Sequence, residues 1–206
     1  MALALGVLIS GRGSNLLAIL DAIQDGRLDA NVNIVISNKE NAGGLELAKE
    51  RGIQTKFIDP KTFAQENNRR EAYDLVVGKM LQEHGVECVV LAGYMRIVTP
   101  ALIRMFPSKM VNIHPSLLPS FPGLDAQRQA LEWGAKVSGC SVHFVTEGVD
   151  EGPIICQKPV VINQGDTVET LSERILEQEH RLYPEALQLM AQERLQVDGR
   201  TVRILH

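Results

Sequence analysis

Two polar residues suited to acyl-transfer chemistry lie together at the end of an apolar run. Asn112 and His114 are separated by one residue, and Met110 to Ile113 is typical of a buried strand. Because side chains alternate along a strand, both residues are expected on the same side of it. Asparagine offers a neutral amide donor and histidine a proton that moves near neutral pH, and such a pair can stabilise an oxyanion and shuttle a proton. The same residues are equally compatible with a hydrogen-bonded pair in the core.

An acidic loop follows another apolar run, Ser138 to Val145, which predicts a second strand. The loop contains Thr146, Glu147, Gly148, Val149 and Asp150. A carboxylate from this loop that reached His114 would favour the imidazolium and raise the pKa of His114. A solvated acidic turn would have the same composition, so the loop alone does not decide between the two interpretations.

The first glycine-rich segment predicts an anion site. Ser10 to Asn15 reads Ser-Gly-Arg-Gly-Ser-Asn and joins an apolar run to a helical pattern, where backbone N–H groups and the helix dipole favour negative charge. A dinucleotide fold would need a third glycine and an acid after the second strand, and a P-loop would need Gly-Lys-Ser/Thr. The segment therefore favours a phosphate monoester, although a turn that uses glycine only for its backbone freedom remains an alternative.

The proline-rich segment Pro115 to Gly123 is expected to be a stiff loop directly after the Asn112–His114 pair. It forms either a pocket wall or merely a rigid connection. Ser116 has no nucleophile-elbow motif around it, and none of the cysteines has an activating neighbour, so direct attack by a substrate amine fits better than nucleophilic catalysis. The five histidines lack metal-ligand spacing, and we expect no metal site.

Alternating strand and helix patterns must position these residues. Apolar runs predict strands, and helical patterns separate them, in the first half of the chain: the predicted strands are Leu3–Ser10, Val32–Ser37, Thr55–Ile58, Cys88–Ala92 and Met110–Ile113. Such alternation predicts an α/β fold with a mainly parallel, twisted sheet and helices on both faces. Ligands are then expected beyond the carboxyl ends of the strands.

The second half of the chain departs from strict alternation. Ser138–Val145 and Ile154–Val161 follow one another without a long helix between them, and the sequence leaves their pairing open. Asp166 is expected to cap a long helix, which Pro184 is expected to break. Asp198-Gly199 predicts a terminal hairpin.

Composition limits the function classes. The 206 residues are 45% hydrophobic and carry a net charge of -4, which suits one α/β domain over residues 1–206 and offers no footprint for nucleic acid. Three cysteines without a C-x-x-C pair indicate reduced core residues. The absence of a basic leader and of a long apolar stretch predicts a cytoplasmic chain that neither enters a membrane nor is secreted.

Five segments together resemble one enzyme family. They are Ser10 to Leu16, Leu91 to Ile97, Asn112 to Pro119, Ser141 to Val145 and Val149 to Ile155. From about Ala4 to about Ala191 the chain is similar to the folate-dependent phosphoribosylglycinamide formyltransferases. The third and fifth segments are shared by formyl-folate enzymes generally and imply the reaction, whereas the glycine-rich turn supports the acceptor.

The resemblance implies a Rossmann-like formyltransferase domain, with phosphate binding in its N-terminal part and folate binding and catalysis in its C-terminal part. It implies transfer of the formyl group of 10-formyltetrahydrofolate, a co-substrate, to the amine of glycinamide ribonucleotide in purine biosynthesis, without a metal. The catalytic residues would be Asn112, His114 and Asp150. The substrate would contact Gly13, Ser14, Asn15, Leu176, Glu177, Gln178 and Glu179. The folate would be bordered by Arg70, Met95, Arg96, Ile97, Val98, Thr146, Glu147, Gly148, Val149 and Asp150.

One position departs from the pattern, because some members carry a histidine where this chain has Asp125, which we assign no catalytic role. The main rival is a formyl-folate hydrolase, a type that usually carries a regulatory domain before the catalytic one, whereas this chain begins at its first strand. Transfer to an aminoacyl-tRNA would imply a longer chain. A non-catalytic folate- or nucleotide-binding protein is the alternative from another class. We expect small-molecule partners and a monomer or homodimer.

Overall fold

The computed structural model describes residues 2–205, which form two compact units divided between Val111 and Asn112. The first unit consists of alternating strands and helices. Its elements are β1 (Leu3–Ile9), α1 (Ser14–Gln24), β2 (Ala30–Ser37), α2 (Gly43–Glu50), β3 (Gln54–Phe57), a 3-10 turn (Pro60–Phe63), α3 (Arg69–Glu83), β4 (Cys88–Leu91) and α4 (Pro100–Met105). The strands expected here are confirmed, with ends that differ by at most two residues.

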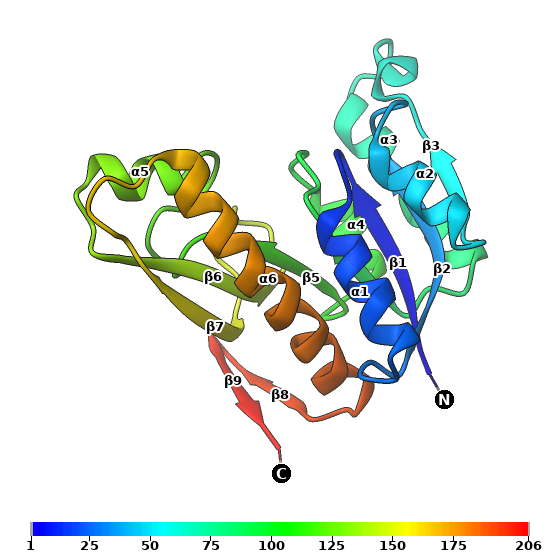
Figure 1. Ribbon diagram of the computed structural model, residues 1–206. Coiled ribbons are helices and arrows are strands. Elements are labelled where there is room, and N and C mark those ends of the chain that lie inside the picture. The colour runs from blue at the N-terminus through cyan, green and yellow to red at the C-terminus, as the bar shows by residue number, and fades with distance from the viewer. Residues whose placement is uncertain (1, 206) are drawn as a thin grey trace. The chain divides into compact units, whose positions relative to one another are not determined.

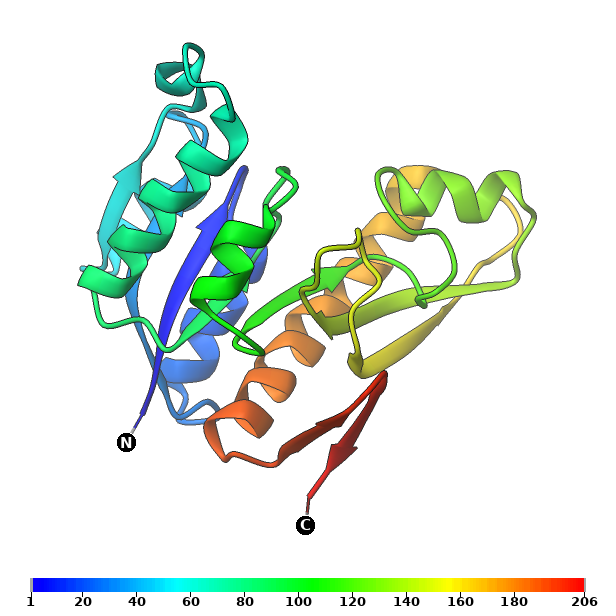
Figure 2. The same cartoon turned by 180° about the vertical axis from the view of Figure 1, so that it is seen from behind.

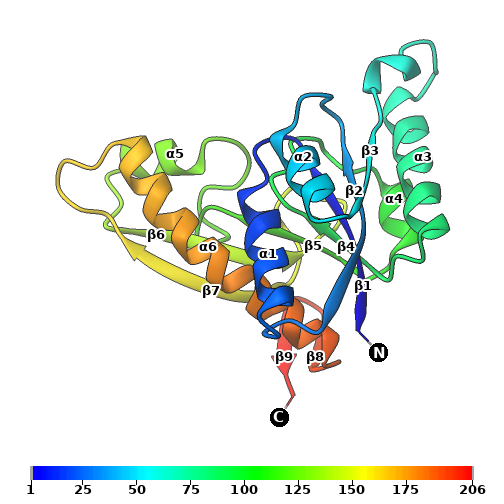
Figure 3. The ribbon, with the colours of Figure 1, turned by 45° about the vertical axis from the view of Figure 1, so that its right-hand side comes forward.

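The sheet of the first unit has the strand order β3-β2-β1-β4, and its strand pairs are parallel. β1 is a central strand, and its Leu5, Val7, Leu8 and Ile9 side chains are fully buried, as expected for a strand covered on both faces. Helices α1 and α2 cover one face, and α3 and α4 cover the other (Figures 1, 2 and 3). The segments after β1, β2 and β4 therefore meet at the carboxyl edge of one parallel sheet.

The second unit has mixed strand directions. It contains the end of β5 (Met110–His114), then α5 (Ala126–Glu132), β6 (Val137–Phe144), β7 (Ile154–Val161), α6 (Val168–Ala191), β8 (Leu195–Asp198) and β9 (Thr201–Ile204). The strand order is β5-β6-β7-β9-β8, with β6–β7 and β8–β9 antiparallel and β7–β9 parallel. This gives the pairing that the sequence left open and confirms the terminal hairpin. Helix α6 packs on β6 and β7 (Figure 1).

The predicted α/β class with a mainly parallel sheet is confirmed, whereas two local expectations for α6 are wrong. Thr167, not Asp166, is the N-cap, because its side chain accepts a hydrogen bond from Thr170 N, while Asp166 pairs with Arg174. Pro184 does not break the helix but lies inside it and is buried. Apolar side chains on both sides of the proline hold the helix to the core, and their burial outweighs the one backbone hydrogen bond that proline removes.

The prediction of one domain over residues 1–206 stays a prediction beside this division into two units. Within residues 2–205, no helix combines the length and the apolar composition that crossing a bilayer requires.

Candidate active site

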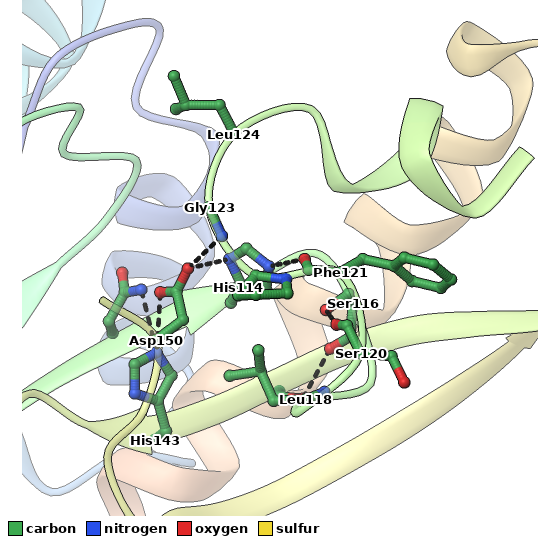
Figure 4. Close-up of polar contacts among 12 residues, drawn as sticks. His114, Ser116, Leu118, Ser120, Phe121, Gly123, Leu124, His143 and Asp150 are labelled. Carbon is green, nitrogen blue, oxygen red and sulfur yellow. Dashed lines mark hydrogen bonds and ion pairs between the residues drawn. The ribbon is translucent and has the colours of Figure 1, made fainter. Parts of the chain in front are cut away.

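The carboxyl end of β5 positions Asn112 and His114 beside Asp150, which comes from the loop after β6 (Figure 4). His114 is 4% exposed, and its Nδ1 lies 3.3 Å from Asp150 Oδ2. The amide of Asn112 lies 3.2 Å from Nε2 of His143, and the same Nε2 lies 3.5 Å from Asp150 Oδ1. The three residues expected to be catalytic therefore converge, and a fourth polar side chain, His143, joins them.

The loop that carries Asp150 is closed tightly. Phe144 N donates to Pro153 O at 2.9 Å, and a Cβ on Gly152 would lie 1.7 Å from the Phe144 carbonyl oxygen, so only glycine fits there. Asp150 itself has φ +55°, and its Oδ2 accepts a 2.8 Å hydrogen bond from Gly123 N. The tight closure fixes the carboxylate against the histidines.

The proline-rich loop is a wall of this cluster. His114 Nε2 lies 2.9 Å from the carbonyl oxygen of Phe121 (Figure 4). The loop is held from β6 and β7, because Ser141 Oγ donates to Ser116 O and Gln157 Nε2 donates to Leu118 O. The loop thus presents a carbonyl to His114 and an N–H to Asp150, so it does more than connect two elements.

Burial and hydrogen bonding pull the pKa of His114 in opposite directions. Burial is the largest influence and lowers the pKa of His114 below 6.5, although the Phe121 carbonyl and the Asp150 carboxylate both raise it. The expectation that Asp150 raises the pKa of His114 is confirmed for its own contribution. The net pKa is nevertheless lowered, because burial disfavours the imidazolium by more than the two acceptors favour it.

Asp150 is held ionised in the same cluster. Burial raises the pKa of Asp150, but the neighbouring His143 imidazole, the Gly123 N–H and the charge of a protonated His114 together lower it further, so the net pKa is below 3.8. At neutral pH the cluster therefore combines a carboxylate anion with a buried histidine that releases its proton readily. That combination suits the transfer of a proton to or from a reacting group.

His143 is the residue that the sequence analysis missed. It is 2% exposed, and its Nδ1 lies 2.9 Å from the Phe144 carbonyl oxygen. A carbonyl can only accept, so Nδ1 carries the proton and the neutral ring presents a lone pair at Nε2. That lone pair accepts from Asn112 Nδ2 and thereby fixes which way the amide points. The available signal was the position of His143, seven residues before Asp150 and on the strand leading to its loop.

The predicted phosphate turn lies in the first unit, at the start of α1. Gly13 has φ +83°, and a Cβ there would lie 2.6 Å from the Cα of Gly44, so both the conformation and the close approach require glycine. Gly44 N donates to Gly11 O at 3.1 Å. Ser14 begins α1, and Asn15 is 8% exposed. The turn thus brings the N-terminus of α2 against that of α1, and the two helix dipoles favour an anion together.

The loop after β4 contains four of the residues expected at the folate, and their side chains differ in exposure. Met95 and Ile97 are 64% and 57% exposed, whereas Val98 is buried. The guanidinium carbon of Arg96 lies 4.3 Å from the centre of the Tyr73 ring. Met95 and Ile97 are therefore available to a flat ligand ring, while Arg96 and Val98 hold the loop. Arg70 is exposed on α3.

The remaining predicted residues belong to the second unit. Glu179 of α6 is buried, Leu176 and Gln178 are half-buried, and Glu177 is exposed. Successive helical residues point about 100° apart, so the side chains of these four residues spread around the helix. In the loop before Asp150, Gly148 is half-buried, and the exposed residues are Thr146, Glu147 and Val149. Asp125 adopts φ +55° at the start of α5, without a side-chain capping bond.

Comparison with known proteins shows extensive similarity. The formyl transferase family model matches residues 4–187. The chain is 44% identical to the phosphoribosylglycinamide formyltransferase of Escherichia coli strain K12 over 93% of this chain and 88% of that protein. A crystal structure of glycinamide ribonucleotide transformylase 1 from Symbiobacterium toebii has 53% identity and a TM-score of 0.96, covering 100% of this chain and 95% of that one.

Longer relatives match through one part only. The chain is 48% identical to the trifunctional purine biosynthetic protein adenosine-3 of Bos taurus over 90% of its own length, but it spans 18% of that protein.

Proposed function

The chain belongs to the formyl transferase family, and from that premise we propose that it transfers the formyl group of 10-formyltetrahydrofolate to the amine of glycinamide ribonucleotide, a step of purine biosynthesis. The observation that carries the proposal is the convergence of Asn112, His114 and Asp150 at the carboxyl end of β5. The relatives that match this chain over most of their length carry the same activity in their names.

The chemistry follows from what each side chain can donate. The substrate amine attacks the formyl carbon, and the carbonyl oxygen gains negative charge as the carbon becomes tetrahedral. The amide of Asn112 and a protonated His114 donate hydrogen bonds to that oxygen. Asp150 stays ionised and stabilises the imidazolium, which offsets part of its burial cost. As the tetrahedral intermediate collapses, the bond between the formyl carbon and N10 of the folate breaks and His114 gives its proton to N10, so tetrahydrofolate leaves. The proton lost by the amine returns to His114, and no covalent enzyme intermediate is required.

The binding surfaces fit both reactants. The Gly13–Asn15 turn, where two helix N-termini meet, suits the phosphate of glycinamide ribonucleotide. The exposed side chains of Met95 and Ile97 suit a flat pterin ring. We further assign the remaining predicted contacts, on α6 and on the loop from Thr146 to Asp150, to the ribonucleotide and the folate respectively. Holding both reactants in line supplies the proximity contribution to the rate.

The direct test mixes the purified protein with 10-formyltetrahydrofolate and glycinamide ribonucleotide and follows the release of tetrahydrofolate. Release that requires the amine supports formyl transfer. We expect Asn112→Ala and His114→Ala each to lower the rate on the order of a hundredfold, since one aligned donor contributes roughly 3 kcal/mol. Near-normal rates in both variants would contradict the assignment of Asn112 and His114 as catalytic residues.

The rival activity within the same chemistry is hydrolysis, in which water replaces the amine. Release of tetrahydrofolate without the amine, at the same rate as with it, would favour the hydrolase. Binding of both ligands without any release would favour a non-catalytic binding protein. We further propose that the protein acts in the cytoplasm, on small molecules, as a monomer or homodimer.

A further inference from the structure

Ser10 occupies a junction in the first unit that the proposed chemistry does not use. It follows the last residue of the central strand β1 and begins the predicted phosphate turn. Its side chain is 4% exposed, and its hydroxyl donates to Asn38 Oδ1 at 2.5 Å. The same hydroxyl oxygen accepts from Met95 N at 2.8 Å, and Ser10 N donates to Gly93 O at 3.1 Å. One buried residue therefore bonds to the loops that follow both neighbouring strands, β2 and β4.

These bonds leave the hydroxyl no freedom. A serine hydroxyl has one proton, and that proton is given to Asn38, so the lone pair that faces Met95 has a fixed direction. Met95 N then has a defined position only while the hydroxyl keeps this rotamer. The start of the phosphate turn, Ser10 to Asn15, and the start of the folate loop, Ala92 to Thr99 after β4, are thus joined by a directional contact rather than by packing alone.

The far end of the folate loop is held from another element. Thr99 N donates to Asp74 Oδ2 at 2.6 Å, and Asp74 is 1% exposed on α3. Arg96 lies over the ring of Tyr73, also on α3. The α3 contacts therefore anchor one end of the loop independently of the phosphate turn. At the other end, the Met95 and Gly93 backbone is tied to the turn by Ser10.

We propose that Ser10 is a positioning residue that couples the binding of the phosphorylated substrate to the binding of the folate. This inference rests on the proposed function, because it takes the turn as the phosphate site and the loop as the folate site. A ligand bound to either segment stabilises the arrangement in which Ser10 makes both bonds, and that arrangement also fixes the backbone position of the other segment. Each ligand then tightens the binding of the other by the same factor.

The test measures that factor without turnover. Calorimetry gives the Kd of glycinamide ribonucleotide alone and in saturating tetrahydrofolate, which has no formyl group to transfer. We expect the wild-type protein to bind the ribonucleotide about fivefold or more tightly when the folate is present. In Ser10→Ala this ratio falls below about twofold. Ser10→Thr, which keeps a hydroxyl, is expected to restore part of the ratio.

A matched control is the serine at the end of the neighbouring strand β2. Ser37 ends β2 and is fully buried, and in the described hydrogen bonds its hydroxyl contacts only its own turn, where it accepts from Lys39 N and donates to Lys39 O. Ser37→Ala removes an equally buried hydroxyl without touching the folate loop, so the wild-type ratio is expected to remain. If Ser10→Ala does not fold, Asn38→Ala removes the partner that orients the hydroxyl and must lower the ratio instead.

Each outcome has a defined meaning. A wild-type protein without coupling, or a Ser10→Ala variant that folds and keeps the wild-type ratio, overturns the inference. Loss of both affinities with an unchanged ratio also overturns it, because that result describes a merely structural serine. Turnover of the wild-type protein separates the two proposals: absent amine-dependent transfer defeats the proposed function and this inference together, whereas intact transfer with an unmoved ratio defeats this inference alone.

Discussion

Replacing His143 by alanine tests whether the orientation of the Asn112 amide matters for the rate. The substitution removes the ring nitrogen that accepts from Asn112 Nδ2 at 3.2 Å and that lies 3.5 Å from Asp150 Oδ1. His143 has both ring nitrogens in protein contacts, so it has no nitrogen left for a substrate. Its effect must therefore pass through Asn112 and Asp150.

The size of the effect follows from the contacts. Leaving the half-buried Asn112 amide donor without its acceptor costs about 1–3 kcal/mol. Free to rotate, the amide no longer points at the developing oxyanion, so most of this cost is expressed in the transition state. Since about 1.4 kcal/mol is tenfold in rate, His143→Ala should lower kcat roughly tenfold to a hundredfold. The KM values of both substrates should change less than about twofold, because ground-state binding does not use this amide.

The assay is the steady-state kinetics of tetrahydrofolate release with each substrate varied in turn. His143→Gln keeps a carbonyl acceptor and is expected to recover part of kcat. Ser138→Ala is the control on the same strand, since Ser138 is 1% exposed and its hydroxyl has no hydrogen-bond partner among the described residues. A His143→Ala variant with wild-type kcat, or one in which only KM rises, would refute the reasoning.

Three further outcomes are expected. In the free protein, NMR of the His114 ring should show a titration midpoint below pH 6.5. Asp150→Asn should move the midpoint lower still, because it removes a charge that raises the pKa of His114. A midpoint above 6.5 would contradict the conclusion that burial outweighs the two acceptors. Because the pKa of His114 is lower in the folded protein than in the unfolded chain, its contribution to stability is fully present above pH 6.5 and is lost as the pH falls below that value. The free energy of unfolding, measured by urea denaturation, should therefore decrease as the pH is lowered below 6.5. Gly152→Ala should destabilise by about 3 kcal/mol or more, because its Cβ would lie 1.7 Å from the Phe144 carbonyl oxygen. In Gly148→Ala the new Cβ meets only the Glu151 side chain, whose carboxylate can turn away, so this variant should unfold near the wild-type temperature. Equal melting temperatures for the two variants would show that the loop is not closed as described.

The agreement between sequence and structure is best where the signal is local. The alternating strands and helices of residues 2–111 were predicted within two residues at the strand ends, because buried parallel strands and the turns after them have a recognisable pattern over a few residues. The glycine requirement at Gly13 was also partly visible as a turn, although its contact with Gly44 was not.

The errors arise where packing overrides a local rule. Pro184 normally ends a helix, but α6 continues through it because the helix is held to β6 and β7 by buried side chains on both sides of the proline. The carboxylate partner of His114 could be anticipated from the motif, but the net lowering of the pKa of His114 could not, because it depends on the depth of burial.

By itself, the sequence determined the fold class, the order of the elements of the first unit and the residues that end β5, since periodicity and turn chemistry are properties of neighbouring residues. Only the tertiary structure decided that His143 orients Asn112, thirty-one residues away, and that Ser10 joins the loops after two other strands. Such contacts depend on strand order and register, which are set by the burial of whole strands against their neighbours, and no short segment of the sequence encodes them.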